Sequence, residues 1–172
     1  RSGTTVENEA ESKSSTKSEL NRKRHLVLLA MNQEGLNNIF KLVSESYNGD
    51  YFYRKPRIDL DLLKKHNEGV IALSACLGGV YAGCYWENRE EGSDAVLTAM
   101  RSMSQKMLNI FGDRWYGELQ WNAIPEQHEL NSYVIQMHQE LGVPLVSTCD
   151  SHYPTPNAWN DRELYKKIGW LG

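Results

Sequence analysis

The 172-residue sequence has few cysteines, and they form no familiar pattern. The three, Cys76, Cys84 and Cys149, are an odd number and include no C-x-x-C pair. This argues against a disulfide framework and against a zinc ribbon, and it favours a reducing, cytoplasmic compartment. Long apolar runs are also missing, since no segment approaches the roughly 20 apolar residues of a membrane-spanning helix. The N-terminus lacks the apolar stretch of a signal peptide, so we expect no membrane contact.

An excess of positive charge is absent as well. The 19 Lys and Arg residues against 22 Asp and Glu residues give a net charge of -3. Any contact with nucleic acid must therefore be local. The sequence has no G-x-G-x-x-G, no G-x-x-x-x-G-K-[ST], no H-E-x-x-H and no G-x-S-x-G motif. Metal-assisted hydrolysis is the reaction class for which several candidate groups remain.

The chain changes character at His25. Residues 1–24 are polar, and we expect a flexible loop or tail there because too little apolar surface is available to offset the entropy of ordering. Four apolar runs of strand length then alternate with helical periodicity, and we expect the first of them, HLVLLAM, to be covered on both faces. This alternation predicts an α/β protein with a largely parallel sheet, either open or closed into a barrel. The runs are HLVLLAM, GVIALS, WYGELQW and VPLVST, and the helical stretches are 35–47, 60–66, 80–86, 93–111 and 125–141.

Polar residues with metal-binding chemistry follow two of these strands. Cys76 comes after GVIALS, and Asp150-x-His152 comes after PLVST. Residues two apart on extended backbone point to the same side, so the Asp and His side chains could bind one cation. The alternatives remain a helix-capping Asp150 with a solvated His152, and a Cys76 that is only a small buried residue. Glu118 lies inside a strand, where a buried carboxylate needs a metal, an Arg or water.

Four segments together resemble the polymerase and histidinol phosphatase (PHP) domain of bacterial DNA polymerase III alpha subunits, the C-family replicative polymerases. The resemblance runs nearly unbroken from His25 to Tyr153, in residue identity, order and spacing. It implies a distorted βα, TIM-like barrel of PHP type, of which residues 25–172 would be the C-terminal part, with the first strands missing. The segments are HLVLLAMNQEGLNNIFKLVSESY, PRIDLDLLKKHNEGVIALSACLGG, FGDRWYGELQWNAIPEQHELN and LGVPLVSTCDSHY.

The resemblance also implies a metal site. His25 matches the ligand of the H-L-x-x-L-A motif, Cys76 matches a position that is Cys or His in the family, and Asp150 and His152 match its closing D-x-H pair. Such sites hold Zn²⁺ or Mn²⁺, and the group that attacks the phosphoester would be a metal-activated water, with Asp150 as a candidate participant. Glu118 aligns with a recurrent position that we do not count as a ligand. We expect the four ligands to lie within about 10 Å of one another.

The sequence also departs from the family pattern. It contains no H-x-H motif, and it reads AWNDRELYKKIGWLG where typical members have A-H-E. Because half of the site and the polymerase palm with its Mg²⁺ would be absent, we expect this chain alone to bind metal weakly and to lack nuclease activity. The implied partners are DNA, through the parent polymerase, and replisome subunits such as the clamp and an exonuclease. Two rival readings are a non-catalytic scaffold that braces the polymerase and a stand-alone PHP-type phosphatase.

Overall fold

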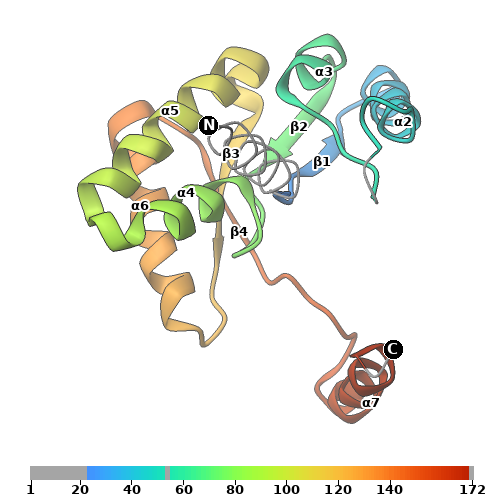
Figure 1. The fold of residues 1–172 in the computed structure, drawn as a ribbon, viewed down its shortest axis with the longest axis vertical. Helices are drawn as coiled ribbons and strands as arrows, with labels where there is room; N and C mark the ends of the chain where they lie inside the picture. Colours follow the sequence, from blue (N-terminus) through green and yellow to red (C-terminus); the bar gives the residue numbers. More distant parts are fainter. Residues whose placement is uncertain (1–22, 53–54, 171–172) are drawn as a thin grey trace, which may run out of the picture.

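The computed structural model describes residues 23–52 and 55–170, so most of the predicted tail 1–24 lies outside the described residues (Figure 1). The strands are β1 (Val27–Ala30), β2 (Val70–Leu73), β3 (Trp115–Gln120) and β4 (Leu145–Thr148). The α-helices are α2 (Gln33–Ser46), α3 (Leu60–Lys65), α4 (Val80–Asn88), α5 (Ser93–Phe111), α6 (Pro125–Leu141) and α7 (Trp159–Trp170). Short 3-10 turns cover Arg89–Glu91, Gly112–Arg114 and Pro156–Ala158.

The four strands form one sheet in the order β1-β2-β3-β4. Strands β2, β3 and β4 run parallel, with Ala72 opposite Trp115 and Gly117 opposite Leu145. Helices α4 and α5 connect β2 to β3, and α6 connects β3 to β4. Parallel neighbours need such helical connections because the chain must return to the end of the sheet at which it started. The predicted α/β class is confirmed, and the arrangement is compatible with part of a PHP-type fold.

Strand β1 differs from the prediction in direction and in burial. It pairs antiparallel with β2, with Val27 opposite Leu73 and Ala30 opposite Val70. The chain therefore leaves β1 and enters β2 at the same end of the sheet, so α2 and α3 form no crossover. The expectation that this strand is covered on both faces is wrong, because β1 lies at the edge of the sheet and Leu29 is 49% exposed.

Helices α4, α5 and α6 pack against one another and against the sheet, and they enclose the core (Figure 1). The Trp115 side chain is fully buried, and its indole nitrogen donates to the Tyr81 hydroxyl at 3.0 Å. Met100 and Met107 are also fully buried on α5. The apolar stripe predicted for residues 93–111 is therefore a core-facing stripe, and its methionines fill the core.

Helix α2 buries mainly a different face from the apolar one that its sequence pattern predicts. Its buried positions are mostly small or polar, whereas the residues that recur at helical spacing are largely exposed. Asn38 shows why the polar face is accommodated, since its amide donates to the Glu68 carbonyl at 2.8 Å. The buried residues are Gly35, Asn38, Leu42 and Ser46; of the residues at helical spacing, Leu36, Phe40, Val43 and Tyr47 are exposed and Ile39 is half-buried against the core.

Helix α7 lies at the end of an extended segment that follows β4 (Figure 1), and its first turn borders a cavity that Cys76 and Leu77 also line. Its side chains Leu164, Tyr165 and Ile168 are 60–78% exposed. Among the described helices, none has the length and apolar character needed to cross a membrane.

Candidate functional site

The strand directions bring the predicted site residues to the same end of the sheet. Because β2 and β4 both run parallel to β3, Cys76 and Asp150 follow strands that terminate at this end. Antiparallel β1 begins at this end, so His25 joins them although it precedes its strand. The His25 backbone nitrogen donates to the Gly78 carbonyl at 2.8 Å, and its Nδ1 lies 3.9 Å from the Cys76 Sγ.

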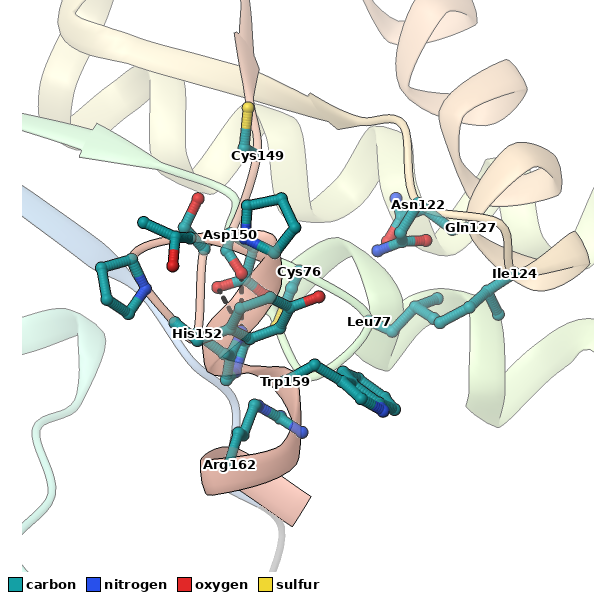
Figure 2. Close-up of a pocket in the computed structure, with 15 residues that line it drawn as sticks. Cys76, Leu77, Asn122, Ile124, Gln127, Cys149, Asp150, His152, Trp159 and Arg162 are labelled. Carbon is teal, nitrogen blue, oxygen red and sulfur yellow. Dashed lines mark hydrogen bonds and ion pairs between the residues drawn. The ribbon is translucent and has the colours of Figure 1, made fainter. Parts of the chain in front are cut away.

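Cys76, Asp150 and His152 line one cavity of about 620 Å³ (Figure 2). The His152 Nδ1 lies 2.6 Å from the Asp150 backbone oxygen and 3.9 Å from the Asp150 carboxylate. Since Nδ1 is engaged with the backbone, Nε2 is the ring nitrogen left to bind a ligand. His25 is exposed and lines a different cavity, with Arg24 and Lys55, so its contact with Cys76 is what links it to this one.

The backbone is strained at both strand ends that carry these residues. Ala75, directly before Cys76, has a φ angle of 63°, and Asp150 has a φ angle of 46°. Residues other than glycine rarely adopt this left-handed region, and such strain is concentrated at functional sites. Gly79 completes the turn after Cys76, because a Cβ atom there would collide with the Ser74 carbonyl oxygen. The sequence pattern did not predict this strain.

Glu118 on β3 connects the ends of β2 and β4 through hydrogen bonds. Its side chain is 5% exposed, and its carboxylate accepts hydrogen bonds from the Ala75 backbone nitrogen at 3.1 Å and from the Thr148 hydroxyl. The Gln120 amide is a third donor, at 3.1 Å. The protein donors to this carboxylate among the described residues are thus one backbone group and two neutral side chains. Glu118 holds the ends of β2 and β4 in place.

The donor groups at this end of the sheet suit zinc, but the side chains form two separate pairs. Thiolate, imidazole and carboxylate are the groups that bind Zn²⁺ in proteins. In residues 23–52 and 55–170, however, no three His, Cys, Asp or Glu side chains are gathered closely enough to hold a metal ion. His25 pairs with Cys76, and Asp150 pairs with His152. Metal binding would require these pairs to approach each other.

The cavity also contains residues that the sequence analysis did not single out. Tyr153, Trp159, Arg162, Asn122 and Gln127 form part of its wall. Figure 2 shows Trp159 and Arg162 on one side and Asn122 and Gln127 on the other. Trp159 and Arg162 fall in the segment where the sequence diverges from the family pattern, whereas Tyr153 is the last residue of the matching segment. Their one signal in the sequence was an aromatic and basic composition close behind the D-x-H pair.

Comparison with known proteins fits this architecture. The family model described as "PHP domain" matches residues 3–122. The DNA polymerase III subunit alpha of Aquifex aeolicus is 42% identical over 132 residues, which are 77% of this chain and 11% of that protein. The subunit of the same name from Borreliella burgdorferi is 41% identical over 75% of this chain and 10% of its own length. The one from Helicobacter pylori is 36% identical over 85% of this chain and 12% of its own length.

Because this family model matches most of the chain, the protein belongs to the PHP domain family. Its relatives in this comparison are alpha subunits of DNA polymerase III, and the chain spans about a tenth of their length. The match ends at residue 122, so it includes Cys76 and the strand that carries Glu118, whereas Asp150 and His152 lie beyond it.

Proposed function

We propose that this chain is part of the PHP domain of a replicative DNA polymerase of the DNA polymerase III alpha type, which acts in template-directed DNA synthesis in the cytoplasm. Family membership and the names of the relatives support this. The observation that carries the proposal is that Cys76 lines a single cavity with Asp150 and His152, although Cys76 lies far from that pair in the sequence. DNA, the clamp and a separate exonuclease are the partners that we propose for the parent polymerase, whose palm would hold Mg²⁺.

We further propose that the cavity is a site of phosphoester hydrolysis and serves 3'-5' exonuclease proofreading. Cys76, Asp150 and the Nε2 atom of His152 would hold Zn²⁺ or Mn²⁺, with His25 beside Cys76. A metal bound there would lower the pKa of a coordinated water toward neutrality. The Asp150 carbonyl fixes the orientation of the His152 ring, and Glu118 fixes the two strand ends, so the chain itself positions the donor groups.

Zinc titration tests the metal part of this proposal. The chain should compete with a chromophoric chelator for Zn²⁺, and Cys76→Ala, Asp150→Asn and His152→Ala should each weaken that competition by about tenfold or more. Cys149→Ser is the matched thiol control, because Cys149 borders the same cavity but its sulfur points away from Asp150 and His152 (Figure 2). Equal affinity in the control and in Cys76→Ala would contradict the assignment.

Hydrolysis is tested separately, with a 3'-labelled single strand and Zn²⁺ or Mn²⁺. We expect no nucleotide release from this chain alone, because the four candidate ligands are not gathered into one cluster and hydrolysis needs a fixed open coordination position. Release that Asp150→Asn abolishes would show instead that these residues already form a working site. In the parent gene, an H-x-H motif upstream and a polymerase palm downstream should accompany this segment.

A second candidate function is a non-catalytic scaffold that braces the polymerase. The separation of the candidate ligands into two pairs favours it. A scaffold would keep its stability in the presence of a chelator, and Asp150→Asn would leave proofreading by the parent polymerase unchanged. The loss of proofreading in that variant would support hydrolysis.

A further inference from the structure

The cavity extends beyond Asp150 and His152 along an aromatic wall. Tyr153 and Trp159 meet edge to face, with ring centroids 5.8 Å apart and planes inclined at 69°. Both rings line the cavity, and Trp159 is 48% exposed. An aromatic ring that a neighbour holds in place while one part stays open offers a surface on which a flat ligand can stack.

Arg162 stands one helical turn beyond Trp159, at the same cavity. Among the described residues it is the only Arg or Lys that lines the cavity, and its side chain is 25% exposed. Its guanidinium lies 3.5 Å from the Glu163 carboxylate, which is longer than the roughly 2.7–2.9 Å of a charge-assisted hydrogen bond. Glu163 pairs more closely with Lys166, at 3.0 Å. The guanidinium is thus held at the cavity by a weak ion pair, and its planar fork suits a phosphate group.

The remaining walls combine apolar and amide groups. Leu77 and Ile124 supply apolar surface. Asn122 and Gln127 each have a buried side-chain oxygen with no hydrogen-bond partner in the part of the chain that the structure describes. A buried acceptor without a donor is costly, so a ligand or water that donates to it is favoured. The cavity volume of about 620 Å³ falls within the range of roughly 300–1,000 Å³ that is typical of small-ligand sites.

We propose that the segment after β4 and helix α7 form a nucleotide subsite, in which Trp159, supported by Tyr153, stacks on a base and Arg162 binds a phosphate. The ligand is a nucleoside monophosphate unit, either free or at the end of a single strand. This inference rests on the proposed function, because it places that unit beside Asp150 and His152. In a chain with a net charge of -3, one guanidinium at the cavity gives the local contact that a polyanion needs.

Binding without metal tests the subsite independently of hydrolysis. The probe is a nine-nucleotide oligothymidylate with a 5'-fluorophore, followed by anisotropy in EDTA with the 172-residue chain. Trp159→Ala should weaken binding by at least about fivefold, and Arg162→Ala by a similar factor, while Trp159→Phe should retain most of the affinity. Tyr165→Ala and Lys167→Ala are matched controls, because both residues lie exposed on α7 and neither lines the cavity. These controls should bind the probe within about twofold of the wild-type chain.

Two further arms identify what is bound. A strand whose 3'-terminal nucleotide lacks its base should bind the wild-type chain more weakly, yet bind Trp159→Ala as well as the intact strand does. Displacement of the probe by thymidine monophosphate at the concentrations at which unlabelled strand displaces it would show that the free nucleotide suffices. Displacement by strands alone would assign the subsite to a strand end.

The subsite is overturned if the wild-type chain does not bind the probe, if Trp159→Ala and Arg162→Ala bind it like the wild type, or if the two controls lose as much affinity. Asp150→Asn separates this inference from the proposed function. That variant should lose zinc affinity yet still bind the probe in EDTA, so either result can fail without the other.

Discussion

The amphipathic helices α2 and α5 have similar sequence patterns, but their apolar residues lie in different environments. The apolar stripe of α5 is buried against α4, α6 and the sheet, with Val96 and Met100 fully enclosed. The stripe of α2 faces outward, and Phe40 is 58% exposed. Hydrophobic periodicity therefore identifies a helix and its apolar face, but it does not say whether the described part of the chain covers that face. We call the assembly of α4, α5, α6, β2 and β3 the packed body, and compare it with β1–α2 and with residues 149–170.

The strongest test of this comparison replaces the same residue type in both helices. Phe111→Ala on α5 removes a side chain that is 1% exposed, so we expect it to lower the free energy of unfolding by about 3–5 kcal/mol. Phe40→Ala on α2 should cost less than about 0.5 kcal/mol, because the ring is largely in solvent already. Urea unfolding followed by circular dichroism measures both. Comparable losses would mean that the α2 stripe is covered in solution, and the comparison would fail.

Local signals in the sequence were sufficient for much of the fold. Asp is a preferred residue directly before a helix, and the Asp59 carboxylate accepts from the Leu62 backbone nitrogen at 2.8 Å at the start of α3. Pro is favoured at the first helical positions, and Pro125 occupies the first turn of α6. Such caps depend on neighbours in the chain, and the strand positions depend on short apolar runs. The direction of β1 could not be read in the same way, because it depends on which strand β1 pairs with.

The residues of the candidate site also differ in whether local sequence signals predict them. Cys76 and Asp150 could be found from the sequence because each follows a strand, and their matching to ligand positions came from the family resemblance. The contacts of Glu118 could not be found, since its partners Ala75 and Thr148 meet it only through the register of β2, β3 and β4. Trp159 reaches the cavity through the path of a loop, which no periodicity records.

A second test asks whether Glu118 connects the packed body to the ends of β2 and β4 at the candidate site. Glu118→Ala leaves the buried Ala75 N–H without its acceptor, and we expect a loss of about 1–3 kcal/mol in the free energy of unfolding. Hydrogen exchange of the Ala75 amide should become faster. Glu118→Gln is the matched control, because its amide oxygen can still accept from this nitrogen, so it should cost less. Unchanged exchange in Glu118→Ala would show that the strand ends are held by other contacts.

A third test compares a thiol of the packed body with one in the C-terminal region. Burial raises the pKa of the Cys84 thiol to about 11, whereas Cys149 is exposed. At pH 8 only about one Cys84 in a thousand is a thiolate, so iodoacetamide should modify Cys149 first. Modification of Cys84 should increase as the pH approaches 11. Peptide mass spectrometry across this pH range measures both rates, and equal rates at pH 8 would contradict the burial of α4.

The smallest effect is expected at the exposed ion pair that joins α5 to α6 on the surface of the packed body. The Arg101 Nε and Nη2 atoms donate to the Glu140 carboxylate at 2.6 and 2.9 Å, and the Gln136 amide adds a third hydrogen bond at 2.8 Å. These bonds, that of Arg101 above all, lower the pKa of Glu140 to about 2. Water and salt screen such an exposed pair, so its effect on stability should be far smaller than that of Phe111→Ala.

The sign of the pH dependence follows from the lowered pKa. The ionised carboxylate stabilises the folded chain, so its contribution is present above the unfolded-state pKa of about 4.5 and is lost as the pH falls toward 2. Glu140→Gln should therefore have a slightly lower urea midpoint than the wild type at pH 7, and the two should converge near pH 2. A double-mutant cycle with Arg101→Gln isolates the pair, and 1 M salt should reduce its coupling. A coupling that stays constant from pH 7 to pH 2 would show that the two helices are joined by packing alone.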